Sequence, residues 1–209
     1  MMRIETLKTT PDRAGRYWLT MDDGQKLAVY RQTLEDFALY AGKELDEEQW
    51  RALQEAAGAM SAKMRAVRIV AASSVSKKDL QQRLVRKGED PKQAAEAVAW
   101  MEDLHLVDDE ETARQIVLRC ASKGYGIARA KQMLYEKKIP QRCWDVALED
   151  FPDQTEHILS FLRSREEALS DPRQTKKTID ALLRRGHTYS EIRRAMSKMA
   201  LDTDEFPED

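Results

Sequence analysis

Cysteine is scarce in this chain of 209 residues, and its scarcity excludes a fold held together by several disulfides. The two cysteines, Cys120 and Cys143, fall at apolar positions of segments with a helical pattern. A thiol in such a position acts as a small hydrophobic side chain, and unpaired thiols persist in reducing compartments. We therefore expect two buried, free cysteines in a protein of the reducing cytosol.

Long apolar runs are also missing. No segment approaches the ~18 consecutive apolar residues of a membrane span, and the chain does not begin with a charged segment followed by an apolar leader. Positive and negative charges are nearly balanced, because 35 basic and 37 acidic residues give a net charge of only −2. Hydrophobic residues make up 42% and charged residues 34%, which is typical of a soluble protein with extensive helical surface. The sequence predicts a cytoplasmic protein.

The residue patterns of common catalytic and metal sites are absent from the sequence. The three histidines, His105, His157 and His187, are far apart in the chain and lack the spacing of metal ligands. There is no phosphate-binding loop of the Gly-x4-Gly-Lys-Ser/Thr type and no Gly-x-Ser-x-Gly nucleophile motif. We predict a protein that is not an enzyme and needs no cofactor or metal.

The chain does contain a central stretch, residues 108–148, with the pattern of three short helices. Asp108 begins the first of them with the spacing of a capping box. An apolar stripe of helical period follows, formed by Ala113, Ile116, Val117, Cys120 and Ala121. Gly124 and Gly126 end this helix, and Pro140 opens the third.

The turn Gly124-Tyr125-Gly126 has two interpretations. Because it precedes a helix, it could present free N–H groups to a phosphate. A tight turn between packed helices, with Tyr125 alongside, is the interpretation that we prefer.

Basic residues dominate the middle of the central stretch. Between Thr112 and Trp144 there are eight basic residues and one acidic residue, Glu136, so this segment has a net charge of +7. A cationic helical surface suits an anionic partner, such as a nucleic-acid backbone. The candidate binding residues are Arg114, Arg119, Lys123, Arg129, Lys131 and Lys138. Ordinary solvated cations on amphipathic helices are the alternative.

The helical part of the chain is repetitive. Leu84, Leu134 and Leu182 are 50 and 48 residues apart, and each is followed three residues later by a basic residue. A leading helix precedes each leucine, and a further helix follows the turn after it. This pattern predicts three tandem three-helix repeats in an elongated, curved array. The predicted repeats cover residues 61–107, 108–153 and 154–199.

The two ends of the chain differ from the repeats. Residues 1–60 contain two β-rich runs on either side of Asp23-Gly24, which predicts a hairpin or small sheet followed by short helices. Gly58 is expected to break or bend the last of these. Residues 200–209 include five acids and no base, which predicts a solubilising tail, or alternatively one that competes with DNA for the basic helices. The predicted fold class is therefore mainly α, with a small N-terminal sheet.

The central stretch resembles the core signature of the RecX regulatory proteins. The matching residues are Asp108-Asp109, Ala113-Arg114, Lys123-Gly124-Tyr125-Gly126, Arg129, Leu134 and Ile139. Residues 76–88 look like the family's Ser-x-x-Glu-Leu-x-x-Lys-Leu helix, residues 182–192 resemble its C-terminal repeat, and residues 17–45 resemble the β-hairpin extension of some members. The resemblance covers nearly the whole chain, and its most specific part is the Lys-Gly-Tyr-Gly run.

This resemblance implies a modulator of RecA, the recombinase that forms filaments on single-stranded DNA. Family members lie in the filament groove, hinder extension or promote disassembly, and so reduce strand exchange and ATP hydrolysis in DNA repair, recombination and the SOS response. For this chain it implies RecA, its filament and DNA as partners, with phosphate contacts that are independent of sequence. We expect a monomer.

The chain departs from the family pattern at three places. It has Leu104-His105-Leu106-Val107 where Gly-Tyr-Leu is usual, Thr112 where Phe is common, and Lys138 in place of Gly. These are packing or turn positions, so the expected fold is unchanged, while the transfer of individual contacts is weakened.

Two other functions are compatible with the sequence. A sequence-independent DNA-binding protein would act by masking DNA, and would bind it without RecA and with a steep salt dependence. A helical scaffold for another protein would have no affinity for DNA and no effect on RecA.

Overall fold

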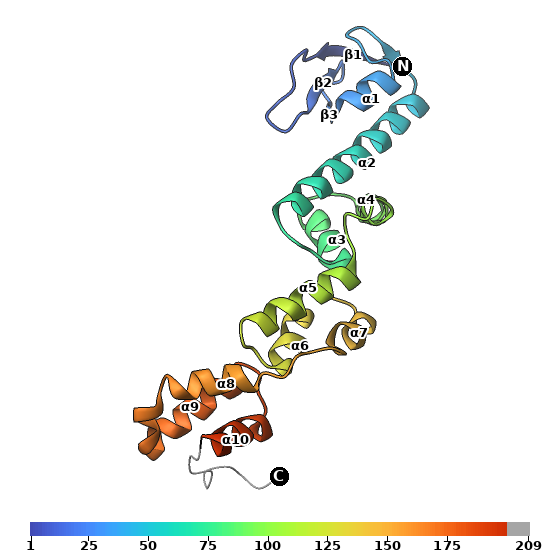
Figure 1. Ribbon diagram of the computed structural model, residues 1–209. Helices are drawn as coiled ribbons and strands as arrows, with labels where there is room; N and C mark the ends of the chain where they lie inside the picture. Colours follow the sequence, from blue (N-terminus) through green and yellow to red (C-terminus); the bar gives the residue numbers. More distant parts are fainter. Residues whose placement is uncertain (200–209) are drawn as a thin grey trace. The chain divides into compact units, whose positions relative to one another are not determined.

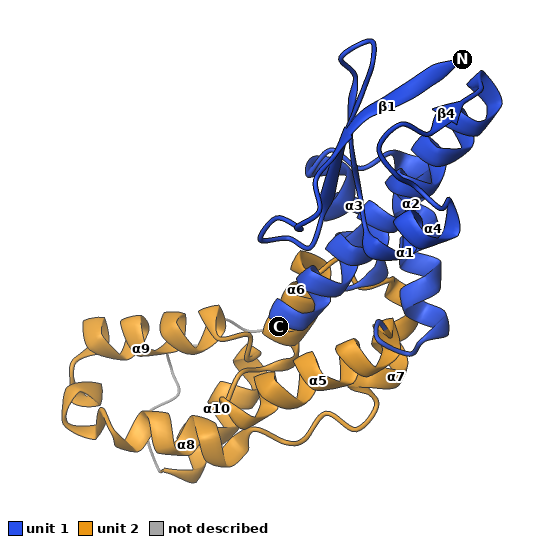
Figure 2. Ribbon diagram, turned by 90° about the horizontal axis from the view of Figure 1, so that it is seen from above, with its two compact units in different colours: residues 1–107 blue, residues 108–209 orange. Residues whose placement is uncertain are grey.

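The computed structural model describes residues 1–199 as a mainly helical chain with a small antiparallel sheet at its N-terminus (Figure 1). The chain divides into two compact units, Met1–Val107 and Asp108–Asp209, which Figure 2 shows in different colours. The predicted fold class is confirmed, whereas the predicted acidic tail at 200–209 lies outside the described residues. In the described part of the chain, no helix has both the length and the apolar character of a membrane span.

The N-terminal sheet has four strands in the order β3-β2-β1-β4, and each neighbouring pair is antiparallel. The strands are β1 (Met2–Leu7), β2 (Tyr17–Met21), β3 (Lys26–Val29) and β4 (Glu44–Leu45). β2 and β3 form the predicted hairpin, whose turn contains Gly24 at φ +84°, a conformation that glycine adopts without strain. No sequence pattern predicts β4, because two residues are too few to show a period.

A single long helix, α2 (Glu47–Ala72), spans most of unit 1. It begins with a capping box, in which the backbone N–H of Gln49 donates to Asp46 Oδ1 at 2.7 Å and the N–H of Asp46 donates to Gln49 Oε1 at 3.1 Å. The helix continues through Gly58 without a break. A Cβ at Gly58 would lie 2.4 Å from Oε1 of Gln93, so the glycine allows α4 (Pro91–Asp103) to pass close by.

The two halves of α2 belong to different hydrophobic cores. The first half packs against the sheet and next to α1 (Arg31–Asp36), as Figure 1 shows. The core of this part contains Ile4, Leu19, Met21, Val29, Leu39, Leu45, Trp50, Leu53 and Ala57. The second half packs against α3 (Lys77–Arg86) and α4, where the fully buried Ala62 and Ala66 let the helices approach closely. One uninterrupted helix therefore sets the position of the sheet relative to the first repeat.

Unit 2 contains the second and third repeats, each with its own hydrophobic core. The second repeat consists of α5 (Asp109–Ser122), α6 (Ile127–Glu136), the 3-10 turn η1 (Gln141–Cys143) and α7 (Trp144–Leu148). The third consists of α8 (Thr155–Arg163), the 3-10 turn η2 (Glu166–Ser170), α9 (Pro172–Arg184) and α10 (Tyr189–Lys198). Thr188 and Glu191 form a capping box at the start of α10. The two cysteines are buried and free, as expected.

The turns after α5 and α9 contact each other through their backbones. The N–H of Gly126 donates to the carbonyl of Arg185 at 2.9 Å, and that of Ala128 donates to the carbonyl of Gly186 at 3.3 Å. A Cβ on Gly126 would lie 2.0 Å from Gly186 O, and a Cβ on Gly186 would lie 2.3 Å from Arg129 N. The second and third repeats can approach this closely only because both positions are glycine.

The N–H groups of the Gly124-Tyr125-Gly126 turn are all used within the protein. Gly124 donates to the carbonyl of Ala121 at 2.9 Å, Tyr125 donates to that of Cys120 at 3.0 Å, and Gly126 donates to the third repeat. The turn therefore has no free backbone donors for a phosphate, and its interpretation as a tight turn between packed helices is confirmed.

We expect Gly126→Ala to destabilise unit 2 by about 2–3 kcal/mol, because the added methyl group would overlap a backbone carbonyl that no side-chain rotation can move away. The thermal unfolding midpoint, followed by circular dichroism, should fall by roughly 5–10 °C. Gly58→Ala is the matched control. There the methyl group meets only the flexible end of Gln93, and alanine is favoured over glycine in a helix by ~1 kcal/mol. An unchanged midpoint for Gly126→Ala would show that the turn contact does not stabilise the fold.

Candidate functional site

Three of the six predicted binding residues gather where α5 ends and α6 begins. Arg119 and Lys123 are four residues apart at the end of α5, and Arg129 lies in the first turns of α6. Burial raises the pKa of the Cys120 thiol, and the positive charges of Arg129, Lys123 and Arg119 each oppose this rise. All three cations are thus within electrostatic range of one thiol. We call these three residues the turn cluster.

The charge of the turn cluster is only partly neutralised within the protein. Arg119 and Lys123 are exposed and have no carboxylate partner among residues 1–199. Arg129 is half-buried; its Nη1 donates to Gln132 Oε1 at 2.8 Å and lies 3.9 Å from Glu136 Oε1. Cations at the end of α5 also interact favourably with the helix dipole, which is the purely structural reason for their presence. Two charges nevertheless face solvent without a partner.

Arg114 does not belong to the turn cluster. Its Nε donates to Glu111 Oε2 at 3.1 Å within the same helix, and this contact lowers the pKa of Glu111. Arg114 precedes Arg119 by five residues, which places it about 7.5 Å away along the helix axis and on another face. Its charge is already paired.

Lys131 and Lys138 lie outside the turn cluster as well. Lys131 lines a cavity of about 440 Å³ together with Asp145 and Glu149, so acidic side chains are close to it. Lys138 lies beyond the end of α6, at φ +57°, and therefore cannot continue the helical stripe of Lys131 and Tyr135 that its sequence spacing indicates. Tyr135 itself is 75% exposed.

An arginine next to the turn cluster is held by aromatic rings. The guanidinium of Arg185 lies 6.0 Å from the ring centre of Tyr125 and 4.6 Å from that of Phe161. Arg165 lies over the same Phe161 ring at 3.8 Å. Such cation–π contacts orient a guanidinium group without neutralising its positive charge. Arg185 is the basic residue that follows Leu182 by three positions in the repeat pattern of the sequence. For Arg165, the only indication in the sequence is its spacing of four residues from Phe161.

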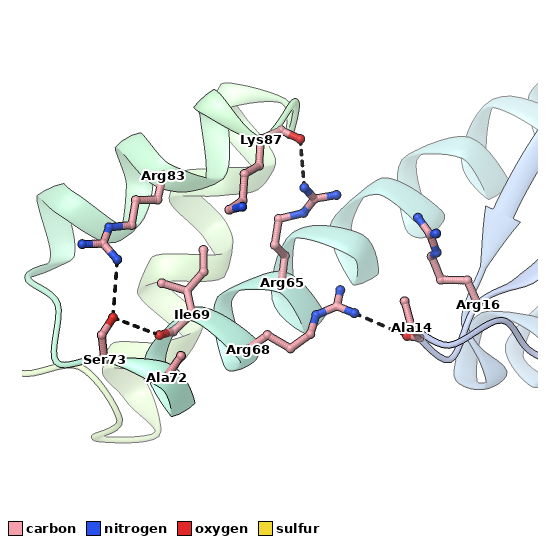
Figure 3. A pocket seen from close by; sticks show the side chains of 9 residues that line it. All are labelled: Ala14, Arg16, Arg65, Arg68, Ile69, Ala72, Ser73, Arg83 and Lys87. Carbon is pink, nitrogen blue, oxygen red and sulfur yellow. Dashed lines mark hydrogen bonds between the residues drawn. The ribbon is translucent and has the colours of Figure 1, made fainter.

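A second group of cations lies in unit 1, where no sequence pattern pointed to it. A cavity of about 480 Å³ is lined by Ala14, Arg16, Arg65, Arg68, Ile69, Ala72, Ser73, Arg83 and Lys87 (Figure 3). Five of these nine residues are basic. The net charge of +3 over residues 61–107 is only a weak indication of a basic surface in unit 1. Arg16 lies in residues 1–60, whose net charge is negative, so the local charge of the sequence does not indicate its place in this group.

The fold defines a helical-repeat protein that carries basic surfaces. The regulatory protein RecX of Clostridioides difficile (strain 630) is 25% identical over 210 residues, which covers 98% of this chain and 97% of that protein. The regulatory protein RecX of Xanthomonas campestris pv. campestris (strain B100) is 31% identical over 134 residues, which covers 63% of this chain and 83% of that protein. The chain belongs to the RecX family of regulatory proteins.

A solved structure supports the fold. The crystal structure of a regulatory protein RecX matches with a TM-score of 0.68 and 22% identity, covering 94% of this chain and all of that one. None of the protein-family models matches the chain. Among residues 1–199, no group of His, Cys, Asp or Glu side chains is arranged to hold a metal ion.

His187 links the two contacting turns of unit 2 through its side chain. Its ring is 4% exposed, Nε2 donates to the carbonyl of Gly124 at 3.1 Å, and Nδ1 is buried without a hydrogen-bond partner among the described residues. Burial lowers the pKa of His187, and Arg185 and His157 lower it further, while the Gly124 carbonyl and Glu191 oppose them. The neutral ring with its proton on Nε2 is therefore the form that fits the fold.

We expect unit 2 to lose stability in acid because of His187. The unfolded state binds a proton with a pKa near 6.5, whereas the folded state binds it only at lower pH. The stabilisation is thus complete above about pH 6.5 and is lost as pH falls through the lower, folded-state pKa. Urea unfolding at a series of pH values should show this loss. His187→Gln, which can still donate to Gly124, should flatten the profile, and the exposed His105→Gln should leave it unchanged. An unaltered profile in His187→Gln would contradict the assignment.

Proposed function

We propose that this RecX-family regulatory protein binds RecA on its single-stranded DNA filament and reduces ATP hydrolysis and strand exchange, with DNA contact contributing. Family membership supports this proposal, because the family resemblance implies RecA as the partner. The observation on which it chiefly depends is the turn cluster, where Arg119 and Lys123 are exposed and have no carboxylate partner among residues 1–199.

The rigid base of the turn cluster favours a binding role. Lys123 immediately precedes the glycine turn whose backbone is tied to the third repeat by the Gly126 hydrogen bond. Cations on a rigid turn lose little conformational freedom on binding, so more of their interaction energy appears as affinity. Their charge also accelerates the encounter with an anionic filament. A regulator of this kind acts by occupying its partner and needs no catalytic group.

The other predicted residues have secondary places in this proposal. Arg114, Lys131 and Lys138 lie on neighbouring surfaces of the same repeat, and we propose that they contact the partner at the edge of the interface. Arg185, which is stacked on Tyr125, is a further contact residue. We also propose that the protein acts as a monomer and that the predicted three-helix repeats, beginning at residues 61, 108 and 154, are its units of recognition.

We expect the double variant Arg119→Glu with Lys123→Glu to lose inhibition of RecA. Each exposed ion pair contributes ~0.2–1 kcal/mol, and reversing the charge adds repulsion of similar size, so at least about fourfold more protein should be needed for half-inhibition. The measurement is DNA-dependent ATP hydrolysis by RecA at substoichiometric amounts of this protein, with DNA in large excess. The control is Lys26→Glu with Lys78→Glu, which changes the same charge at two exposed lysines of unit 1.

Full inhibition by the turn-cluster variant, with circular dichroism unchanged, would refute the role of this surface. Inhibition by the wild-type protein only when it saturates the DNA would instead favour the masking of DNA. The absence of any effect of the wild-type protein would favour a scaffold for another partner.

A further inference from the structure

The basic cavity of unit 1 is formed by Arg16, Arg65, Arg68, Arg83 and Lys87, which come from three parts of the chain. Arg16 immediately precedes β2, Arg65 and Arg68 lie on α2, and Arg83 and Lys87 lie on and just after α3. Figure 3 shows the side chains around the space between α2, α3 and the loop that contains Ala14. The folding of unit 1 therefore brings together cations that are up to 71 positions apart in the sequence.

Three of the arginines are oriented from behind by carboxylates. The pairs are Arg65 Nε with Glu89 Oε1 at 2.6 Å, Arg83 Nη2 with Asp79 Oδ2 at 2.8 Å, and Arg16 Nη2 with Asp12 Oδ2 at 2.8 Å. The side chains of Glu89 and Asp79 are only 7% and 10% exposed, and none of the three carboxylates lines the cavity. The negative charges thus hold the arginines in place without occupying the space in front of them.

The remaining two cations have no carboxylate partner in the described part of the chain. Arg68 is oriented by neutral acceptors, because its Nη2 donates to Tyr30 Oη at 3.1 Å and its Nη1 lies 3.5 Å from the carbonyl of Ala14. The side chain of Lys87 is exposed, while its backbone carbonyl accepts from Arg65 Nη1 at 2.9 Å. Five cations against three carboxylates leave the cavity with a net charge of +2.

We propose that this basic cavity binds neighbouring phosphate groups of a nucleic-acid backbone. Guanidinium groups have five N–H donors in a planar fork that matches phosphate oxygens, and each arginine here uses only part of that set internally. Since the arginines are already held in position, little ordering is needed when the anion binds. The Ser73 hydroxyl, which accepts from Arg83 Nη1 at 3.4 Å, lies at the same wall.

The lining of the cavity favours backbone recognition over recognition of a base. None of its nine residues is aromatic, so there is no platform on which a base could stack. Contacts to phosphate position a protein on nucleic acid without reading its sequence. The site is therefore expected to be independent of sequence. It is separate from the turn cluster and does not depend on the proposed action on RecA.

A phosphate fits this cavity better than an acidic side chain of a protein. Each of the three internal carboxylates is paired with a single arginine of the cavity, as the pair of Arg65 and Glu89 illustrates. In the cavity, by contrast, several cations from three parts of the chain surround a space of about 480 Å³. Both this volume and this positive charge are larger than one carboxylate needs. A phosphodiester, with its strong charge-assisted hydrogen bonds and neighbouring phosphates, uses such an arrangement.

The test is DNA binding by the full chain in the absence of RecA. Fluorescence anisotropy of a labelled oligothymidylate would be measured between about 50 and 200 mM sodium chloride. The cavity variant is Arg68→Gln with Lys87→Gln, which leaves the three internal ion pairs intact. The matched control is Lys26→Gln with Lys78→Gln, two exposed lysines that do not line the cavity.

The cavity variant should bind about 25-fold more weakly at 0.1 M salt, and the slope of log affinity against log salt should decrease by about 1.4, since two phosphate contacts on single-stranded DNA are lost. The control should bind within about twofold of the wild type. Lys87→Gln alone, which removes no side-chain hydrogen bond, should bind about fivefold more weakly and serves if the double variant does not fold.

Equal affinities of the cavity and control variants, or no measurable DNA binding by the wild type, would overturn the proposal. Unchanged DNA affinity with lost inhibition of RecA would also overturn it, because the occupant would then be an acidic protein surface. Lost DNA affinity with full inhibition of RecA would support the cavity and show that it works independently of the turn cluster.

Discussion

The backbone contact between the turns after α5 and α9 holds the second and third repeats of unit 2 together. Gly126 donates to the third repeat, Gly186 closes against α6, and His187 donates to the carbonyl of Gly124. Neither glycine position has room for a Cβ, so this contact requires glycine at both positions. Because the same turn ends α5 and begins α6, it also determines where Lys123 and the other cations of the turn cluster stand.

The two basic surfaces of the protein use different means to orient their cations. In unit 1, three carboxylates, of which Glu89 and Asp79 are buried, hold three arginines from behind, so that the charge faces an open cavity. In unit 2, the rings of Tyr125 and Phe161 hold Arg185. Neither arrangement is evident from a net charge of −2, because the whole-chain value averages these surfaces with acidic segments elsewhere. An anionic partner interacts with the local charge of a surface and not with the net charge of the whole chain.

Local patterns in the sequence correctly indicated the helix starts that depend on neighbouring residues. Asp108 begins α5 as predicted, since a cap is a contact between residues close in the chain. The end of α8 at Arg163, ahead of a 3-10 turn, and the short strand β4 were not predicted. Packing against residues distant in the sequence decides these features. The close approach of Gln93 to Gly58 of α2 is likewise a contact between residues distant in the sequence.

The sequence by itself determined the class of fold, the repeat period, the family and the location of the +7 segment, because each follows from spacing along the chain. Only the tertiary structure decided which cations act together. It assembled Arg16 with Arg68 in one cavity, although the two residues are far apart in the sequence. The reason is physical: cations from different elements meet at a cavity only through the packing of those elements, which the spacing of residues along the chain does not encode.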